Sequence, residues 1–500
     1  MTLKELLKDW VSNINMGLFN DSSILGLALD SRDILKEYVF IALAGAKQHG
    51  ITYADQALEK GACVVVYDPS ECNGVLAKYE RLDHMIAIDG LAIKLGDMAS
   101  RFYGDPSELM AVIGITGTNG KTSCSQFLSQ MLDDCGIIGT LGWGEWNNLH
   151  KTINTTPDAL ETQRILAELL KANKKIVAME VSSHGLDQGR VNGVNFKGAV
   201  YTNISRDHLD YHGTMEAYLK AKLLLLKSTS LSFVVVNLDD LYSKEIIAAV
   251  PENVAIWGIS VKGKAQSNCN CVIADNILST DHGIEFNLYC QGNKHRINVP
   301  LYGDFNVENV LTVFTVMLAM EVTESEAIER LGFIKPVPGR MERIGGNGGP
   351  LVFVDYAHTP DALEKVLGSV KKQCMEALWV VFGCGGDRDK GKRSQMGQIA
   401  VQRADHIIIT DDNPRYENSL DIVNEILIGC KDISNKAASP NIEVIQDRAQ
   451  AIQSVLARAS AKDCIVVAGK GHETYQDVKG VRMSFSDSQV INDALTARIG

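Results

Sequence analysis

The stretch MAVIGITGTNGKTS, residues 110–123, decides the fold, because an apolar run passes directly into a glycine-rich loop. A helical pattern follows, which predicts the order strand, loop, helix. Glycines let backbone amides point at a polyphosphate, Lys121 adds a mobile charge, and the Thr122 hydroxyl can ligate magnesium. Ile115 stands where the Walker pattern has its first glycine, so the loop has the shorter Gly-x-x-Gly-Lys-Thr form. We expect a nucleotide site here rather than a turn without a ligand, formed by Gly117, Thr118, Asn119, Gly120, Lys121, Thr122 and Ser123.

Beyond residue 107, short β-branched runs alternate with longer helical patterns. Continuous apolar strands separated by helices are typical of parallel sheets buried on both faces, so we expect an α/β fold. In such sheets ligands bind beyond the carboxyl ends of the strands, and nearly every run ends in polar or glycine-rich sequence. The expected strands are residues 110–115, 176–181, 199–204, 233–236, 351–354, 378–382, 406–410 and 464–468.

The length of the chain, 500 residues, suits about three domains of ~150 residues each. Two joints divide it. One is Tyr-Gly-Asp-Pro-Ser at 103–107, and the other is Lys-Pro-Val-Pro-Gly at 335–339, where two prolines interrupt both helix and strand. We therefore expect domains at residues 1–106, 107–335 and 336–500.

The composition excludes several classes of partner. The 49 Lys and Arg against 61 Asp and Glu give a net charge of −12, whereas duplex nucleic acid and anionic membranes reward a basic face. Charges at residues 4, 5, 8 and 9 interrupt any signal peptide, and the longest apolar run, at 310–320, is shorter than the roughly 20 residues that span a bilayer. Eleven scattered cysteines favour free thiols in a reducing compartment. We expect a cytoplasmic protein with no membrane span and no nucleic-acid partner.

Two segments at the ends of expected strands carry polar residues that can bind a metal ion. Glu180 lies near the end of a buried strand, where a charge is costly unless it is paired. Magnesium shared with nucleotide phosphates would pair it, and a nearby Lys or Arg is the alternative. The strand at 199–204 leads into Ser-Arg-Asp-His-Leu-Asp-Tyr-His, residues 205–212. Two histidines and two aspartates so close together leave a metal or proton role and a structural role about equally open.

One lysine falls on an apolar helix face. A helix is expected after Thr214, which can cap it, and Lys222 lies on its apolar stripe, whereas Lys220 points elsewhere. Such a lysine either extends its ammonium to solvent or, when buried, has a lowered pKa and special chemistry. The pattern alone leaves both open. The stripe consists of Met215, Tyr218, Leu219 and Leu226.

The segment Asn-Thr-Thr-Pro-Asp, residues 154–158, predicts the start of a helix, with Thr156 as N-cap and Pro157 at the first helical position. This local role is one explanation of the segment. The other is that free donors at the helix start bind an anionic substrate.

Five motifs resemble, in order and spacing, those of the Mur ligase family of bacterial cell-wall synthesis, whose superfamily also holds folylpolyglutamate synthetases. They are residues 117–122, 180–184, 203–208, 303–309 and 355–358, and they extend over most of the chain. The resemblance is greatest to the members that add the third residue of the stem peptide. It implies an N-terminal α/β domain that binds a UDP-sugar, a central P-loop ATPase-like domain with a mostly parallel sheet, and a C-terminal Rossmann-like doubly wound domain.

The activity implied by the resemblance is ATP-dependent amide bond formation, by a monomer, during peptidoglycan precursor synthesis. The γ-carboxylate of UDP-N-acetylmuramoyl-L-alanyl-D-glutamate attacks the γ-phosphate of ATP, and an incoming amine then attacks the acyl phosphate. Like-charge repulsion between carboxylate and nucleotide must be offset by metal ions and by Lys121.

The resemblance also implies the roles of particular residues. One Mg²⁺ would lie between the phosphates, Thr122 and Glu180. A second would be held by His208 and by Lys222, carbamylated by carbon dioxide. The implied catalytic residues are Lys121, Lys222, His208 and Glu180.

Further positions match the substrate contacts of the family. For the adenine end of ATP these are Asn306, Asn309, Arg340 and Asp355. For the UDP-sugar and its dipeptide they are Leu29, Ser31, Ala46, Lys47, Gln48, Asn154, Thr155, Thr156, Ser182, Gln188 and Arg190.

Three loops of the third segment, at 383–393, 412–415 and 469–473, each follow an expected strand, which predicts one pocket at the edge of the sheet. Two guanidinium groups there suit an amino acid with an additional carboxylate, and Glu473 can bind an ammonium. In the resembled family Asp-Asn-Pro-Arg marks the members that use meso-diaminopimelate, because an arginine facing lysine would lose its partner. The residues expected to bind meso-diaminopimelate are Arg388, Asp412, Asn413, Pro414, Arg415, Gly469 and Glu473.

Two other functions share part of this sequence pattern. A folylpolyglutamate synthetase shares the ATP chemistry, but the Asp-Asn-Pro-Arg segment and the separate first domain disfavour it. A P-loop switch protein would bind nucleotide without making a bond, and it leaves Lys222 and the three loops of the third segment unexplained.

Overall fold

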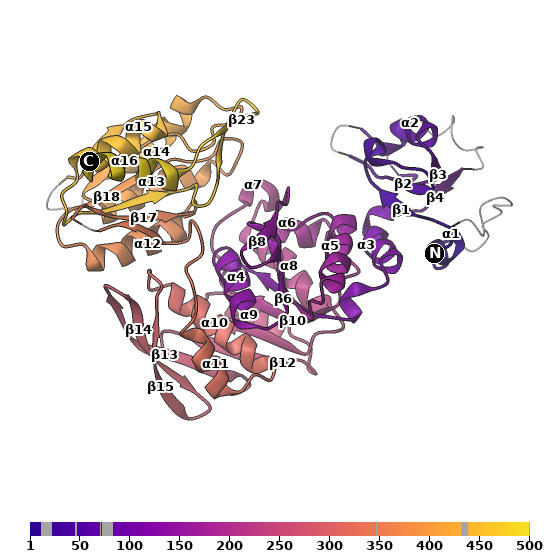
Figure 1. Ribbon diagram of the computed structural model, residues 1–500, viewed down its shortest axis with the longest axis horizontal. Coiled ribbons are helices and arrows are strands. Elements are labelled where there is room, and N and C mark those ends of the chain that lie inside the picture. Colours follow the sequence, from indigo (N-terminus) through magenta and orange to yellow (C-terminus); the bar gives the residue numbers. More distant parts are fainter. Residues whose placement is uncertain are drawn as a thin grey trace. The chain divides into compact units, whose positions relative to one another are not determined.

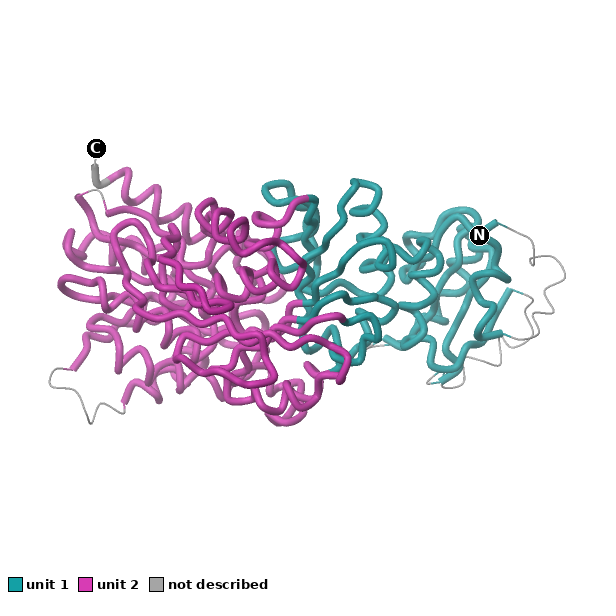
Figure 2. The backbone as a smooth tube through the Cα atoms, turned by 90° about the horizontal axis from the view of Figure 1, so that it is seen from below, with its two compact units in different colours: residues 1–114, 134–199, 224–231 teal, residues 115–133, 200–223, 232–500 magenta. Residues whose placement is uncertain are grey.

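The computed structural model describes residues 1–11, 23–45, 48–70, 72, 84–346, 348–431 and 439–499. Helices and strands alternate through most of these residues, as expected for an α/β protein (Figure 1). The chain forms two compact units. Unit 1 contains residues 1–114, 134–199 and 224–231, and unit 2 contains residues 115–133, 200–223 and 232–500 (Figure 2).

Unit 1 begins with a four-stranded parallel sheet. Its elements are α1 (Leu3–Leu7), β1 (Gly26–Ala28), β2 (Tyr38–Ala42), α2 (Ala54–Glu59), β3 (Ala62–Tyr67), β4 (Met85–Ala87) and α3 (Leu91–Phe102). The strand order is β1-β2-β3-β4. Val39 and Ile41 pack with α1 and α3, and Phe40 and Ala42 pack with α2. Successive side chains point to opposite faces, so the apolar strands bury both.

The rest of unit 1 contributes six strands of a larger sheet. The elements are β5 (Ala111–Thr116), β6 (Cys135–Gly139), β7 (Gly142–Glu145), β8 (Asn148–His150), α5 (Ala159–Lys171), β9 (Ile176–Glu180), α6 (Ser183–Asp187) and β10 (Phe196–Tyr201). Their order is β10-β5-β9-β6-β7-β8. β6 and β9 are parallel, whereas β7 and β8 are antiparallel additions at the edge. The last two residues of β5 and of β10 belong to unit 2.

The first part of unit 2 carries the helices that follow β5 and β10 and five further strands. The elements are α4 (Lys121–Met131), α7 (Leu209–His212), α8 (Met215–Leu223), β11 (Phe233–Asn237), α9 (Ser243–Ala248), β12 (Ala255–Ser260), β13 (Asn270–Thr280), β14 (Gly283–Cys290), β15 (Asn293–Val299), α10 (Asn306–Ala319) and α11 (Glu324–Leu331). β11, β12 and β13 are parallel, and β14 and β15 continue the sheet in antiparallel fashion. Within the described ranges, no helix is long and apolar enough to span a membrane.

The last part of unit 2 is a six-stranded sheet in the order β16-β17-β21-β18-β19-β20, parallel except for β16. Its elements are β16 (Glu342–Gly345), β17 (Leu351–Asp355), α12 (Pro360–Gln373), β18 (Leu378–Phe382), α13 (Gly391–Arg403), β19 (His406–Ile409), α14 (Ser419–Cys430), β20 (Asn441–Val444), α15 (Arg448–Arg458), β21 (Cys464–Ala468) and α16 (Asp487–Ile499), with a hairpin of β22 (Tyr475–Val478) and β23 (Val481–Ser484). The position of β21 between β17 and β18 brings loops that are far apart in sequence to one edge.

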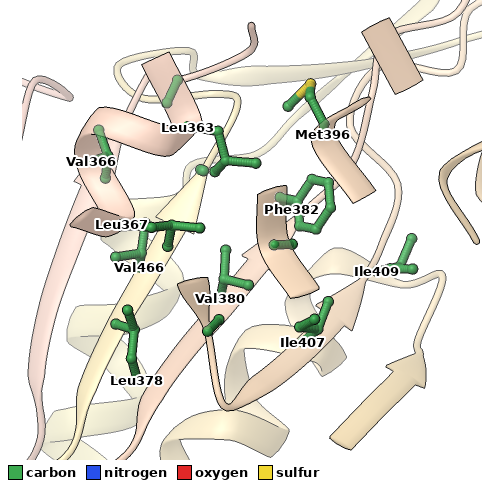
Figure 3. Close-up of a cluster of buried hydrophobic side chains, with 14 of the residues drawn as sticks. Leu363, Val366, Leu367, Leu378, Val380, Phe382, Met396, Ile407, Ile409 and Val466 are labelled. Carbon is green, nitrogen blue, oxygen red and sulfur yellow. The ribbon is translucent and has the colours of Figure 1, made fainter. Parts of the chain in front are cut away.

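Both faces of this sheet are buried. Val380 and Phe382 of β18 pack with α12, α13 and α14 on one face (Figure 3). Trp379 and Val381 of the same strand pack with α15 and α16 on the other. This alternation in a run of five apolar residues confirms the expected doubly covered strand.

The strands expected from sequence are present within a few residues, except that the one expected at 199–204 is β10, at Phe196–Tyr201. Each of the three major sheets has its strands within one of the expected segments 1–106, 107–335 and 336–500. The boundaries themselves stay a prediction.

Candidate active site

The loop before α4 has backbone angles that glycine adopts readily and other residues rarely adopt. Gly117 and Gly120 have φ of 146° and 87°, and a Cβ on Gly117 would lie 1.9 Å from the hydroxyl oxygen of Thr202. The first amides of α4 follow and can donate to an anion. Lys121 folds its ammonium over the loop and donates to the carbonyl oxygens of Gly117 (2.8 Å) and Thr118 (2.9 Å). A positive charge therefore lies directly at the loop.

The chain after β10 supports this loop. Asn203 accepts the Thr118 N–H on its carbonyl oxygen (2.7 Å) and the Asn119 N–H on its side chain (3.0 Å). Thr202 donates its hydroxyl to the carbonyl oxygen of Asn119 (2.6 Å). These bonds explain why β10 ends at Tyr201, because the next residues serve the loop and not the strand. The sequence does not predict these supporting roles of Thr202 and Asn203, although Asn203 opens the motif at 203–208.

Lys222 is buried in α8, which Thr214 caps as expected, with its hydroxyl accepting the Ala217 N–H (3.2 Å). The Lys222 side chain is 1 % exposed. Its ammonium donates to the carbonyl oxygen of Gly117 (2.9 Å) and lies over the Tyr218 ring, 4.6 Å from the centroid. Among the residues that the structure describes, no carboxylate forms an ion pair with it. The solvent-extended alternative is therefore wrong.

The pKa of Lys222 is lowered well below its usual value. Burial is the largest cause, and the nearby charge of Lys121 adds to it, whereas Asp207 acts in the opposite direction. A buried amine without an anionic partner favours its neutral form. Burial thus favours the uncharged, nucleophilic amine of Lys222, whereas Lys220 on the same helix is exposed.

His208 adjoins a cluster of opposite charges around Asp207. The Asp207 carboxylate, 4 % exposed, lies 3.4 Å from Nε2 of His208, 3.8 Å from Nε2 of His358 and 4.0 Å from Nζ of Lys392. Burial would raise the pKa of Asp207, but the hydrogen bond from His358 and the charge of His208 hold it well below its usual range. His208 has a left-handed backbone, φ 54°, at the start of α7. Its half-exposed ring suits contact with a ligand.

Arg340 lies at the nucleotide loop. Its Nη2 donates to the hydroxyl oxygen of Thr122 (3.0 Å), and its guanidinium packs on the Tyr356 ring, 4.4 Å from the centroid. Asn119 also reaches the C-terminal part of unit 2, where its Nδ2 donates to Asp361 (3.0 Å). Arg340, which follows the proline joint at 335–339, therefore contacts the residue next to Lys121. Asp361 was not among the expected residues.

The other residues expected at the adenine end lie in two places. Asn309 Nδ2 donates to the side-chain oxygen of Asn306 (2.8 Å), in the first turn of α10, and Asn309 Oδ1 faces Gly120. Asp355, at the end of β17, accepts the Met341 N–H (2.8 Å). Burial raises the pKa of Asp355, although Arg340 opposes the shift. Asn309 therefore adjoins the loop directly and Asn306 lies next to it, while Asp355 orders the chain that follows Arg340.

Glu180 belongs to unit 1 and is fully buried. Its carboxylate accepts the N–H of Thr140 (2.9 Å) and the hydroxyl of Thr140 (3.0 Å). The Thr140 hydroxyl also contacts that of Thr155 (3.0 Å). The expected substrate residue Thr155 and the expected metal ligand Glu180 are thus linked through one threonine, which sequence did not indicate.

The helix start expected at 154–158 is two residues later than predicted. Asp158, not Thr156, caps α5, since its carboxylate accepts the Glu161 N–H (2.9 Å). Thr156 is occupied elsewhere: its hydroxyl donates to the carbonyl oxygen of Glu180 (3.0 Å) and accepts the Ser182 N–H (2.9 Å). Carboxylate caps are at least as favourable as threonine, which explains the shift.

Several expected substrate residues of unit 1 gather around this segment. Arg190 Nη1 donates to the carbonyl oxygen of Thr156 (2.9 Å), and its Nε donates to Gln188 (3.0 Å). Ser182 caps α6 by accepting the Gly185 N–H (3.0 Å). Asn154, which precedes Thr155 in the sequence, is exposed.

The remaining expected contacts lie in the first sheet region. The Ser31 hydroxyl donates to Gln56 (2.7 Å), Gln48 contacts the Tyr53 hydroxyl, and Leu29 packs at the edge of a core. Ala46 and Lys47 lie outside the described residues.

The three C-terminal loops meet at the carboxyl edge of the six-stranded sheet. The ammonium of Lys470, fully buried, donates to Glu473 (2.8 Å) and Asn413 (3.1 Å). Asn413 Nδ2 in turn donates to Glu473 (2.9 Å). Gly469 passes close to the Asp412 carboxylate. The sequence does not predict a role for Lys470, although it lies in the loop at 469–473. Its ammonium holds two of the expected residues, Asn413 and Glu473, together.

The two expected arginines lie on adjacent loops. Arg415 has φ 51°, and its Nη1 donates to the carbonyl oxygen of Gly386 (2.5 Å). Pro414 precedes it, and its carbonyl oxygen faces the Cα of Gly386. Arg388 donates to the carbonyl oxygen of Asp387 (3.2 Å) and is otherwise exposed. Two guanidinium groups beside a Lys–Glu–Asn cluster can bind a carboxylate and orient an ammonium.

Unit 2 therefore combines a cationic nucleotide loop with a pocket of mixed charge. Unit 1 holds a buried carboxylate within a set of threonine and serine hydroxyls. Among the described residues, no three His, Cys, Asp or Glu side chains form a metal cluster. The magnesium sites stay a prediction.

Family models match most of the chain. The Mur ligase middle domain matches residues 115–317, and the Mur ligase, glutamate ligase domain matches residues 339–471. Both matches include loops described above.

Curated relatives match it over nearly their whole length. The UDP-N-acetylmuramoyl-L-alanyl-D-glutamate--2,6-diaminopimelate ligase of Xanthomonas campestris pv. campestris (strain 8004) is 44 % identical over 100 % of this chain and 98 % of its own. The enzyme of the same name from Coxiella burnetii is 43 % identical over 96 % of this chain and 97 % of its own. A solved structure of a ligase with that name has a TM-score of 0.70 and 34 % identity, covering 100 % of this chain and 99 % of that one.

Proposed function

The chain belongs to the Mur ligase family, and on this premise we propose that it joins meso-diaminopimelate to UDP-N-acetylmuramoyl-L-alanyl-D-glutamate with conversion of ATP to ADP and phosphate. The names of the full-length relatives support the two substrates. The nucleotide loop and the pocket with two arginines support the chemistry. We further propose that the reaction takes place in the cytoplasm, that the protein acts as a monomer, and that the three expected domains are its functional divisions.

The first step we propose is activation of the D-glutamyl γ-carboxylate. A carboxylate oxygen attacks the γ-phosphorus of ATP, the bond to the β–γ bridging oxygen breaks, and ADP leaves an acyl phosphate. The two reactants are both anionic, so positive charge has to be concentrated where they meet. Lys121 supplies it at the loop, and Arg340 adds a second charge beside Thr122. Asn306 and Asn309 would hold the adenine end.

Magnesium, when bound, would neutralise phosphate charge and polarise the phosphoryl oxygens. The residues that would hold it are Thr122 and Glu180 for one ion, and His208 and Lys222, as its carbamate, for the other. The surroundings of Lys222 fit this role, because the amine is buried without a carboxylate partner and its lowered pKa favours the neutral form that reacts with carbon dioxide. Carbamylation would turn a buried amine into an oxygen ligand.

The second step is attack by the amine of the amino acid. Its nitrogen adds to the acyl carbon, the tetrahedral intermediate expels phosphate, and the amine loses its proton as the amide forms. We propose that Arg388 and Arg415 bind the distal carboxylate of meso-diaminopimelate, while Asp412, Asn413 and Glu473 orient its ammonium. Lysine has no distal carboxylate, so it would leave these guanidinium groups unpaired.

The unit 1 residues would bind the nucleotide-linked dipeptide. Arg190 donates to the carbonyl oxygen of Thr156, whose hydroxyl contacts that of Ser182. The Thr155 hydroxyl contacts that of Thr140. Gln188 accepts a hydrogen bond from Arg190. Leu29, Ser31 and Gln48, together with Ala46, Lys47 and Asn154, would contact the UDP-sugar.

The observation that carries the proposal is a nucleotide loop that the buried Lys222 contacts, together with a two-arginine pocket, in a chain similar over its full length to ligases of this name. The test is phosphate release by purified protein. It should require ATP, the UDP-linked dipeptide and meso-diaminopimelate together, and oxygen label from the γ-carboxylate should appear in the phosphate. Release without the amino acid, or with lysine at the same rate, would contradict it.

The other functions make different predictions. A folylpolyglutamate synthetase would bind folate rather than the UDP-linked dipeptide, which a thermal shift measurement separates. A nucleotide switch would hydrolyse ATP at a rate unaffected by amino acids.

A further inference from the structure

Arg393, on α13, is a fully buried arginine with two carboxylate partners. Its Nη1 and Nη2 donate to the two oxygens of Glu417 (3.0 and 2.9 Å), and Nη1 also donates to Glu425 (3.0 Å). Nη2 donates further to the carbonyl oxygen of Gly385 (3.1 Å). Because it is 0 % exposed, Arg393 cannot touch a substrate. Any influence on ligand binding has to pass through its partners.

Glu417 connects the loops that follow β18 and β19. Its carboxylate accepts the Asp387 N–H (2.5 Å) and lies 3.3 Å from Nζ of Lys390. The same two loops are joined by the bond from the Gly386 N–H to the carbonyl oxygen of Asn413 (2.9 Å). A Cβ on Gly386 would lie 1.9 Å from the carbonyl oxygen of Pro414, so the two backbones touch. The carboxylate of Glu417 thus links the loop after β18 to α13 through Arg393.

The two arginines expected to bind the distal carboxylate project from these loops. Arg388 follows Asp387, whose N–H Glu417 holds, and Arg415 lies two residues before Glu417. The side chain of Arg415 donates across to Gly386 (2.5 Å). The spacing of the two guanidinium groups therefore depends on how firmly the loops are held.

We propose that Arg393 and Glu417 form a clamp that positions Arg388 and Arg415 and thereby sets the preference for an amino acid with a distal carboxylate. The inference rests on the proposed function. Bidentate binding of a carboxylate depends on donor geometry, so a small displacement of either loop weakens it. Glu425 shares the same guanidinium but lies on α14 and holds neither loop, so its role is limited to stability.

The test compares three variants in the full-length protein: Arg393→Lys, Glu417→Gln and Glu425→Gln. We measure kcat and KM for meso-diaminopimelate and for ATP, and kcat/KM for lysine. Arg393→Lys keeps the charge but loses the fork, so KM for meso-diaminopimelate should rise about tenfold, the change that ~1.4 kcal/mol produces. KM for ATP should stay within about twofold, and preference over lysine should fall about tenfold. Glu417→Gln should have the same pattern.

Glu425→Gln is the matched control. It removes one bond to the same guanidinium and should lower the melting temperature without changing the preference. If all three variants lose stability but keep the amino-acid preference of the wild type, the pair is merely structural and the proposal is wrong. If the variants fold poorly, amide hydrogen exchange is measured at residues 385–390 and 413–417 of Glu417→Gln. Unchanged protection of these residues would also overturn the proposal. A wild-type protein that does not use meso-diaminopimelate would instead contradict the proposed function.

Discussion

The nucleotide loop and the amino-acid pocket are built in opposite ways. The loop is one continuous stretch, residues 116–122, and Lys121 donates to carbonyl oxygens three and four residues away. The pocket is formed from residues 383–388, 412–417 and 469–473, and Lys470 reaches Asn413, 57 residues away in sequence. One site is encoded locally and the other by the order of strands.

This difference predicts which substitutions should impair each site. The loop depends on a few groups that act directly on phosphate, so changes there should affect every reaction of the protein. The pocket depends on contacts between loops, so changes there should alter which amino acid is used. Four substitutions test this division.

Lys121→Ala should have the largest effect. Removal of the charge at the loop leaves the repulsion between carboxylate and nucleotide without compensation, and we expect kcat for phosphate release to fall about a thousandfold. The loss should be the same with meso-diaminopimelate and with lysine. A loss that depends on the amino acid would break the division between the two sites.

Lys222→Ala should have the next largest effect, about a hundredfold on kcat. Lys220→Ala, two residues away and exposed, is the matched control and should leave activity unchanged. Because burial lowers the pKa of Lys222, its uncharged amine is favoured and should take up ¹³C-labelled carbon dioxide. A ¹³C carbamate signal that persists in Lys222→Ala, or is absent from the wild type, would contradict this role.

Arg415→Lys should act on the pocket alone. The substitution removes the hydrogen bond to the carbonyl oxygen of Gly386 and the paired N–H donors of the guanidinium. We therefore expect kcat/KM for meso-diaminopimelate to fall about a hundredfold. KM for ATP should not change, and turnover with lysine should be unaffected or improved. An equal loss of ATP affinity would show that the two sites are not separable.

The same division explains what the sequence could predict. The nucleotide loop and the place of Lys222 on the apolar helix face follow from local pattern, because glycines, a helix start and a 3.6-residue period are all read within a few turns. The burial of the Lys222 ammonium is known only from the structure. Arg340 and Asn309 entered only through resemblance to a family. The contact from Arg340 to Thr122 joins residues 218 apart in sequence and has no local signal.

The site residues that the sequence did not predict are those that support other side chains and loops. Asn203, Lys470, Glu417 and Asp361 hold ligand-facing groups through bonds to loops from other strands. The position of Lys470 depends on β21 lying between β17 and β18, and that of Asn203 on β10 lying beside β5, which are properties of whole sheets. The misplaced N-cap at Thr156 has a similar cause, since that hydroxyl is engaged by Glu180 and Ser182 instead of by its own helix.

The smallest effect should be one of stability, and it concerns the pocket. The hydrogen bond from Arg393 is the largest cause that lowers the pKa of Glu417 from 4.5 to about 2. A carboxylate with a depressed pKa stabilises the folded state above its unfolded value of 4.5, and that stability is lost as the pH falls from there toward 2. Glu417→Gln should therefore lower the melting temperature by several degrees at about pH 6 and by much less at about pH 3.

Glu329→Gln, an exposed change on α11, serves as the control for this measurement and should follow the wild type at both values. If the deficit of Glu417→Gln were the same at low and neutral pH, the carboxylate would not be the group that holds the two loops. If it shrinks as expected while binding of an ATP analogue is unaffected by the substitution, the pocket depends on this ion pair and the nucleotide loop does not.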